Sequence, residues 1–278
     1  MGILLDGKQL AQEMRQALKE KVKQCETQPK LAVLLVGTDP ASHTYVRLKQ
    51  LACVEVGIAF ELLAYPEFVT EEELLKRIQE LNARSDITGI LVQLPLPGQN
   101  PDPLIAAIDP KKDVDGFHPE NLEHLRLGQP SLAPAVALGI LKLIEVTKIS
   151  LSQKHIVIVS SQFFGEPLIH LFTKDGAQSS IVSSKDPTLA QHTQQADILI
   201  CAVGHPGLIT KKMIKPGAVV IDVGTTKVDQ KIVGDIAPDA IEVAGWMTPV
   251  PGGVGPMTVA LLLTNVLQAY AWQKNTPE

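Results

Sequence analysis

Short runs of β-branched and aliphatic residues alternate with amphipathic stretches along most of the chain. The apolar runs lie at residues 31–36, 58–64, 89–94, 155–160, 179–183, 197–203 and 218–223. Several of them are hydrophobic at consecutive positions, as strands of a parallel sheet covered on both faces are. The stretches between them have apolar residues at helical spacing, as at 8–24, 42–56, 71–84 and 167–174. The alternation predicts an α/β fold with a mostly parallel sheet.

The order of these elements indicates two domains. The first set of strands ends in GILVQLPLPGQNPDP, and a loop rich in Pro, Asp, Gly and His covers residues 109–129 before the second set starts at His155. Residues 138–146 predict a helix that connects the halves. Residues 257–272 predict a second helix, long enough to pack back on the first half. The first domain is therefore expected to be discontinuous, and 278 residues suffice for two domains.

Composition narrows the class of protein. Hydrophobic residues make up 45% and charged residues 20%, which supports a packed core and excludes a disordered chain. The net charge of -5 and the absence of a basic block exclude nucleic acid as the main partner. Asp6 and Lys8 interrupt any signal peptide, and no segment is expected to reach the ~18–20 apolar residues of a membrane span. We expect a soluble, cytoplasmic protein with no membrane partner.

Neither the cysteines nor the acidic clusters predict a metal site. Cys25, Cys53 and Cys201 lie far apart and form no C-x-x-C pair, so we expect buried or idle thiols. The segment KDVDGFHPEN gathers two Asp, a His and a Glu, but their spacing is not that of a calcium loop. A carboxylate held by its Gly turn, Asp115, can instead accept hydrogen bonds from the N–H groups of a heterocycle.

Tyr45 and Lys49 form the first candidate catalytic pair. They are four residues apart on a predicted helix, so the phenol and the amine share one face. A lysine beside a buried polar neighbour can have its pKa lowered, which would let it act as an acid or a base. The alternative is a solvated helix face with the tyrosine at its edge.

Gln93 is a polar residue at the end of an apolar strand, immediately before LPLP. The carboxyl end of a parallel strand faces the crevice where α/β folds bind ligands, which favours a role in a binding site. The alternative is a glutamine that hydrogen-bonds only to its own loop.

Two loops have the composition of ligand-binding turns. TPVPGGVGPMT combines prolines, which fix φ, with glycines, which let the backbone approach a ligand closely; its alternative is a tight turn between domains. VSSQFFGEP follows the 155–160 strand, where a dinucleotide-binding domain has its phosphate loop, but it lacks the G-x-G-x-x-G pattern.

Six segments in this order resemble one family. They are YVRLK (45–49), GILVQLPLP (89–97), KDVDGFHP (112–119), ADILICAVGHPG (196–207), GAVVIDVG (217–224) and TPVPGGVGPMT (248–258). The chain is similar, essentially from end to end, to the bifunctional methylenetetrahydrofolate dehydrogenase/methenyltetrahydrofolate cyclohydrolase family. Tyr-x-x-x-Lys also occurs in short-chain dehydrogenases, but there it follows a glycine-rich first strand, whereas Tyr45 precedes the Rossmann-like segment by about a hundred residues.

The resemblance implies a multifunctional enzyme of one-carbon metabolism, which also supplies purine biosynthesis. It would oxidise 5,10-methylenetetrahydrofolate with NADP and hydrolyse the 5,10-methenyl product to 10-formyltetrahydrofolate. Residues 1–137 with 257–278 would form a folate-binding catalytic domain, and 138–256 a Rossmann-type NAD(P)-binding domain. A folate cleft at their junction and a homodimer are further implications.

The resemblance also implies residue roles. Lys49, Tyr45, Gln93 and Asp115 would be catalytic: Lys49 exchanges protons, Tyr45 stacks on the substrate, Gln93 tunes Lys49 and Asp115 binds the pterin. Substrate would also contact Leu94, Pro251, Gly252 and Gly253. NADP, or NAD in its place, would be bound by Val159, Ser160, Ser161, Gly165, Ser184, Lys185, Val203, Gly204 and Thr225.

The expected cofactor site departs from the family pattern. The usual G-R-S-x-x-V-G-x-P is VSSQFFGEP here, so the first Gly and the Arg are absent and Glu166 adds a negative charge near a 2′-phosphate. Lys185 is a candidate substitute cation. Residues 134–139 and 222–226 also differ from the family. A cyclohydrolase without dehydrogenase activity, or a non-catalytic folate-binding homologue, is therefore an alternative. NADP-dependent formation of the methenyl product separates the bifunctional enzyme from the cyclohydrolase, and measurable methenyl hydrolysis excludes the non-catalytic homologue.

Overall fold

The computed structural model describes residues 2–229 and 231–275, which form two compact units. Residues 2–11 and 136–258 form one, which we call the six-stranded unit; residues 12–135 and 259–275 form the other, the three-stranded unit. The sequence places the first eleven residues in the folate-binding domain. By their contacts, residues 2–11 group with the six-stranded unit, because β1 (Ile3–Leu4) pairs with β11 (Trp246–Met247).

The six-stranded unit contains a fully parallel sheet in the order β1-β11-β8-β7-β5-β6. Its longer strands are β5 (His155–Val159), β6 (Gln178–Val182), β7 (Ile198–Cys201) and β8 (Val219–Asp222). Every residue of β7 and β8 is buried, as their continuous apolar runs predict. An antiparallel hairpin of β9 (Thr226–Val228) and β10 (Lys231–Val233), which the sequence analysis does not predict, follows β8.

Alternate side chains of the six-stranded sheet pack in one apolar cluster. Val157 and Val159 of β5, Leu199 of β7 and Val220 of β8 lie in it. The segments that cover them include α8 (Leu189–Thr193) and the short 3-10 helices η1 (Lys211–Met213) and η2 (Pro238–Glu242). Two further helices of this part of the chain are α6 (Ala135–Val146) and α7 (Gln162–Thr173).

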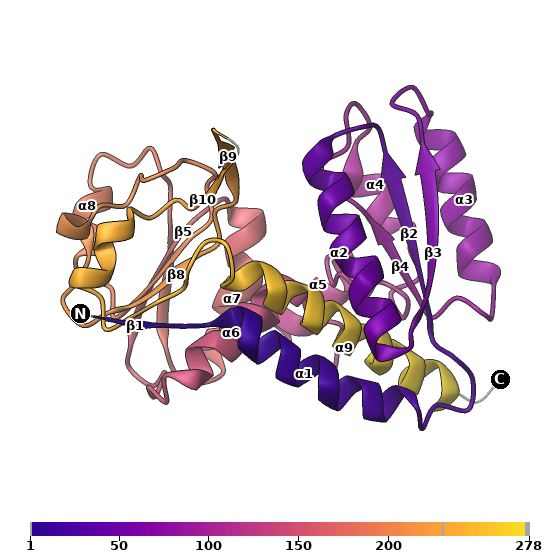
Figure 1. Cartoon of the computed structure of the whole chain (residues 1–278), viewed down its shortest axis with the longest axis horizontal. Helices are drawn as coiled ribbons and strands as arrows, with labels where there is room; N and C mark the ends of the chain where they lie inside the picture. The colour runs from indigo at the N-terminus through magenta and orange to yellow at the C-terminus, as the bar shows by residue number, and fades with distance from the viewer. Residues whose placement is uncertain (1, 230, 276–278) are drawn as a thin grey trace. The chain divides into compact units, whose positions relative to one another are not determined.

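The three-stranded unit has a parallel sheet in the order β3-β2-β4, formed by Ala59–Tyr65, Lys30–Val36 and Gly89–Val92. Side chains of α3 (Glu71–Ala83) and α4 (Pro101–Ala106) pack with β2 and β4 in one buried cluster. Figure 1 shows α2 (Pro40–Val56) on the side of this sheet opposite α3. The helix α5 (Pro119–Arg126) follows the loop after α4.

Two long helices contain residues of both units, α1 (Gly7–Val22) and α9 (Val254–Asn275). The expectation that no segment is long and apolar enough to cross a membrane is wrong for α9, since 254–274 meet that length and hydropathy. More than half of this stretch is buried inside the protein, and Leu262, Leu263 and Val266 are fully inaccessible. Such burial is the property of a core helix.

Candidate active site

The sequence around α2 fixes where the helix begins and ends. Asp39 caps it by accepting a 2.8 Å hydrogen bond from the Ser42 N–H, and Pro40 occupies the first turn. Gly57 ends it with φ of 88°, a left-handed conformation that glycine adopts without strain. Between these caps, Tyr45 and Lys49 lie one turn apart. Lys49 is only 9% exposed, so the alternative of a solvated face is wrong for this residue.

Gln93 lies at the carboxyl end of β4 and contacts Lys49. Its backbone N–H donates to the Leu34 carbonyl at 2.9 Å, which continues the pairing of β4 with β2. The Lys49 Nζ donates to Gln93 Oε1 at 2.9 Å, and Gln93 Nε2 donates to the Leu94 carbonyl at 2.6 Å. The amide therefore bonds both to Lys49 and to its own loop. Because an ammonium only donates, this arrangement holds the amide oxygen toward Lys49.

Asp115 and Lys49 interact electrostatically, and burial shifts the pKa of both groups. Burial lowers the pKa of the Lys49 amine below its ordinary value, and the Asp115 charge opposes that shift. Burial also raises the pKa of the Asp115 carboxyl, which the Lys49 charge opposes. A lysine of lowered pKa can exist as the neutral amine that accepts a proton.

Cys53 is one helical turn beyond Lys49 and is also buried. Burial raises the pKa of its thiol to about 12. Cys53 therefore stays protonated near neutral pH and is not a nucleophile of this site.

The loop that carries Asp115 is held by a residue that the sequence analysis did not assign to the site, Asp113. Its buried carboxylate accepts hydrogen bonds from the Gly116 N–H at 3.1 Å, the His118 N–H at 2.7 Å and Asn121 Nδ2 at 3.1 Å. The Ile90 N–H of β4 donates to the Lys112 carbonyl at 2.8 Å, so the loop runs beside β4. These bonds bring Asp115 to the strand end that carries Gln93.

The structure thus brings Lys49, Gln93 and Asp115 together in the three-stranded unit. Tyr45 is half-buried on the same helix as Lys49, and Leu94 is half-buried next to Gln93. The other predicted substrate residues, at 251–253, belong to the six-stranded unit. There Gly252 has φ of 112° and its carbonyl accepts the Lys8 N–H at 2.8 Å.

The predicted cofactor residues follow four neighbouring strands of the six-stranded sheet. The carboxyl ends of adjacent parallel strands meet at one edge of the sheet, where dinucleotides bind in such folds. Most of these residues stand at the end of a strand or within three residues after it: Val159, Ser160 and Ser161 for β5, Ser184 and Lys185 for β6, Val203 and Gly204 for β7, and Thr225 for β8.

The start of α7 has the features of a phosphate-binding turn despite its altered sequence. The Ser161 side chain caps the helix by accepting from the Phe164 N–H at 3.4 Å. A Cβ on Gly165 would lie 2.7 Å from the Ile181 side chain and 2.9 Å from Ser160 Oγ, so only glycine lets the helix pack this closely on β6. The Lys185 side chain is an exposed cation in the loop that follows β6. Ser161, Gly165 and Lys185 fit a dinucleotide with a 2′-phosphate, whereas the negative charge of the exposed Glu166 on α7 opposes one.

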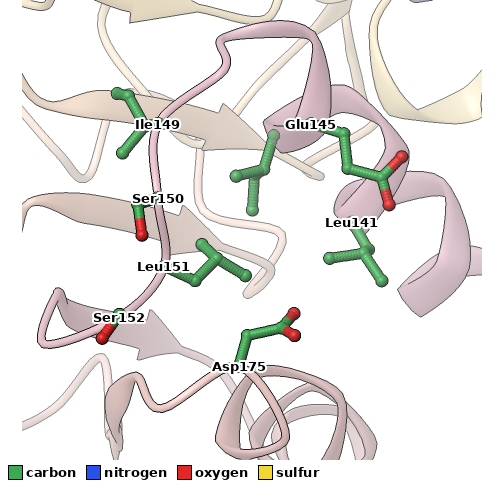
Figure 2. A pocket seen from close by; sticks show the side chains of 8 residues that line it. Leu141, Glu145, Ile149, Ser150, Leu151, Ser152 and Asp175 are labelled. Atoms are coloured by element: carbon green, nitrogen blue, oxygen red, sulfur yellow. The ribbon is translucent and has the colours of Figure 1, made fainter.

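A separate hollow of about 360 Å³ lies in the six-stranded unit (Figure 2). It is lined by Leu141, Ile144, Glu145, Ile149, Ser150, Leu151, Ser152 and Asp175. None of the residues predicted for catalysis or binding is among them. In residues 2–229 and 231–275, no group of three or more His, Cys, Asp or Glu side chains is placed to hold a metal ion.

Comparison with family models assigns both parts of the chain. Residues 5–115 match the catalytic domain of tetrahydrofolate dehydrogenase/cyclohydrolase, and residues 134–274 match the NAD(P)-binding domain of the same family.

Individual relatives agree with this match over the whole length. A protein of Exiguobacterium sibiricum named "Bifunctional protein FolD" is 48% identical, and the alignment covers 97% of this chain and 99% of that protein. The crystal structure of a bifunctional methylenetetrahydrofolate dehydrogenase/cyclohydrolase from Campylobacter jejuni superposes with a TM-score of 0.93 at 40% identity, covering 98% and 99% of the chains. A Trypanosoma brucei enzyme complexed with NADP and an inhibitor gives 0.94 at 32% identity, covering 99% of each chain.

Proposed function

The chain belongs to the tetrahydrofolate dehydrogenase/cyclohydrolase family, and on that basis we propose that it catalyses both reactions of that family. It oxidises 5,10-methylenetetrahydrofolate to the 5,10-methenyl form with NADP, and it hydrolyses the methenyl form to 10-formyltetrahydrofolate. The observation that carries the proposal is the buried Lys49, bonded to Gln93 and facing the charge of Asp115. We further propose a cytoplasmic homodimer.

The hydrolysis needs proton transfers that Lys49 is suited to perform. Water attacks the cationic methenyl carbon, and the neutral amine of Lys49 accepts a proton from that water as the C–O bond forms. The resulting ammonium then donates a proton to the departing nitrogen as the C–N bond breaks, which yields the 10-formyl product. Gln93 holds Nζ in place during both transfers, because its own amide is fixed by the Leu94 carbonyl.

The oxidation uses the same folate site. NADP, when bound, supplies the acceptor for the hydride that leaves the methylene carbon. Loss of the hydride creates positive charge on the folate, and a neutral Lys49 avoids a second positive charge beside it. Asp115 binds the pterin and contributes a negative charge near the developing cation. Tyr45 contributes an aromatic face for the substrate.

The dinucleotide is held at the carboxyl edge of the six-stranded sheet. We assign its phosphates to the start of α7, where Ser160 and Ser161 stand at the helix N-terminus. Lys185 supplies the positive charge that binds the 2′-phosphate, since the turn after β5 has no arginine. Gly165 keeps α7 close to β6 so that these groups converge.

The pH dependence of hydrolysis tests the role of Asp115. If neutral Lys49 is the base, activity rises with pH as Lys49 loses its proton. The Asp115 charge raises the pKa of Lys49, so Asp115→Asn should lower that pKa and move the rising limb of the kcat profile to lower pH. The measurement is kcat for methenyl hydrolysis against pH, corrected for the uncatalysed rate.

An exposed carboxylate on α3 provides the control for this experiment. Glu80→Gln removes a charge from the same unit and should leave the profile where it is. A limb that stays in place or moves to higher pH in Asp115→Asn would contradict the assignment of Asp115 and Lys49 to one electrostatic pair.

A further inference from the structure

Two buried acidic residues of the six-stranded unit have no part in the mechanism described so far. Asp235 is 0% exposed and Asp222 is 2% exposed. Burying a carboxylate is costly unless hydrogen-bond donors surround it, so their partners indicate what the two groups do. The hydrogen bonds that these two carboxylates accept, described below, come from backbone N–H groups.

Asp222, the last residue of β8, fixes the backbone that carries Asp235. Its Oδ1 accepts from the Gly224 N–H at 2.9 Å and from the Asp235 N–H at 3.0 Å, and its Oδ2 accepts from the Ile236 N–H at 2.9 Å. The Asp222 N–H donates in turn to Thr248 Oγ1 at 2.8 Å. The backbone of Asp235 is therefore tied to the end of β8.

The Asp235 side chain reaches the turn that follows β7. Its Oδ2 accepts from the Val203 N–H at 2.7 Å and from the Gly204 N–H at 3.1 Å. Gly204 has φ of 69°, so this turn has a left-handed residue that the two bonds hold in place. One carboxylate oxygen thus sets the conformation of two consecutive residues.

Glycines on both sides make room for these carboxylates. A Cβ on Gly224 would lie 2.6 Å from Asp235 Oδ1, and a Cβ on Gly234 would collide with the Asp222 carboxylate. The two acidic groups therefore fit only because both positions lack side chains.

We propose that Asp235 is a positioning residue for the dinucleotide site, acting through the turn at Val203 and Gly204. The inference rests on the proposed function, which assigns these two residues to the cofactor. Since Asp235 occupies both N–H groups, the turn has no donors left there for a phosphate. Its polar groups are carbonyl oxygens, and that of Val203 lies 3.1 Å from His205 Nδ1. The phosphates and the adenosine belong to the start of α7 and the end of β6, on the other side of β5 from β7. The turn therefore contacts the nicotinamide half.

The test compares a whole dinucleotide with a fragment that lacks the nicotinamide. Binding of NADP and of adenosine 2′,5′-bisphosphate is measured by titration calorimetry. Asp235→Ala frees the turn and should raise the Kd for NADP about tenfold or more, while the Kd for the bisphosphate stays within about twofold of the wild-type value. Asp235→Asn should restore NADP binding, because its amide oxygen can still accept both N–H bonds.

A carboxylate at the other end of β7 from the turn separates positioning from general destabilisation. Asp197 lies just before β7, at its other end, where it accepts from the His155 N–H at 3.0 Å and from Lys215 Nζ at 2.7 Å. Asp197→Ala should lower the melting temperature without changing the Kd for NADP. If Asp235→Ala does not fold, Asp235→Ser, which is too short to bond both N–H groups, provides the same comparison.

The outcomes separate a failure of the role of Asp235 from a failure of the proposed function. Unchanged NADP affinity in Asp235→Ala, or an equal loss of NADP and bisphosphate binding, overturns the role of Asp235 alone. Failure of the wild-type protein to bind NADP overturns the proposed function, and this inference with it.

Discussion

Methionine in place of Lys49 is expected to reduce kcat for methenyl hydrolysis by at least about a hundredfold, the range typical of losing a positioned acid or base. Methionine matches lysine in length and is apolar. It therefore suits this position, which is 9% exposed and belongs with Val46 and Cys53 to the buried residues of α2. The main cost is that the Gln93 amide oxygen loses its hydrogen-bond donor. The free energy of unfolding should therefore fall by only about 1–3 kcal/mol. Initial rates and the melting temperature are the two measurements.

The neighbouring residue supplies the control for Lys49. Gln50 follows it on the same helix and is exposed, so Gln50→Ala should retain the wild-type rate. A folded Lys49→Met protein that hydrolyses the methenyl substrate at the wild-type rate would remove Lys49 from the mechanism.

The second large effect is expected at Asp113. Asp113→Ala leaves the Gly116 N–H, the His118 N–H and Asn121 Nδ2 without their buried acceptor. With a penalty of ~1–3 kcal/mol for each of these three buried donors left unpaired, a total loss of about 3–9 kcal/mol follows. The loop that carries Asp115 also loses its support, so the KM for the folate substrate should rise. Urea denaturation and KM for the folate measure the two effects.

An exposed acidic residue nearby is the matched control for Asp113. Glu120→Ala, in the first turn of α5, should change stability by no more than about 0.5 kcal/mol and leave KM unchanged. Equal stability of Asp113→Ala and the wild-type protein would show that these hydrogen bonds do not hold the loop.

The strands at the centre of each sheet are predictable because they are buried on both faces. Their signal is a continuous apolar run, and β5, β7 and β8 fall within the predicted ranges. The two-residue strands β1 and β11 have no such signal, since their pairing joins positions more than two hundred residues apart. The same pairing explains why the first residues group with the six-stranded unit.

The candidate site was predictable where a residue type conflicted with its position. A lysine on a buried helix face and a glutamine closing an apolar strand are both polar side chains where apolar ones belong, and the structure joins Lys49 to Gln93. The roles of Asp113 and Asp235 could not be derived in this way. Apart from the Asn121 side chain on Asp113, their partners are backbone N–H groups, which every residue except proline has. The sequence around each aspartate therefore resembles an ordinary polar loop.

The expectation that no segment could span a membrane was wrong for α9 for a related reason. A helix that is apolar on most sides can cross a bilayer or occupy a protein core, and hydropathy alone is the same in both cases. In α9 the distinction comes from its buried side chains and from Asn265, which donates to the Val114 and Ala133 carbonyls at 2.9 Å each.

The most direct test of the account is the assay of both reactions with one purified protein. NADP and 5,10-methylenetetrahydrofolate are supplied first, and formation of the methenyl product is followed by its near-ultraviolet absorbance; hydrolysis of added methenyltetrahydrofolate is then measured without NADP. We expect NADP-dependent formation of the methenyl product together with its hydrolysis. Hydrolysis with no NADP-dependent oxidation would contradict the bifunctional assignment and leave a cyclohydrolase alone.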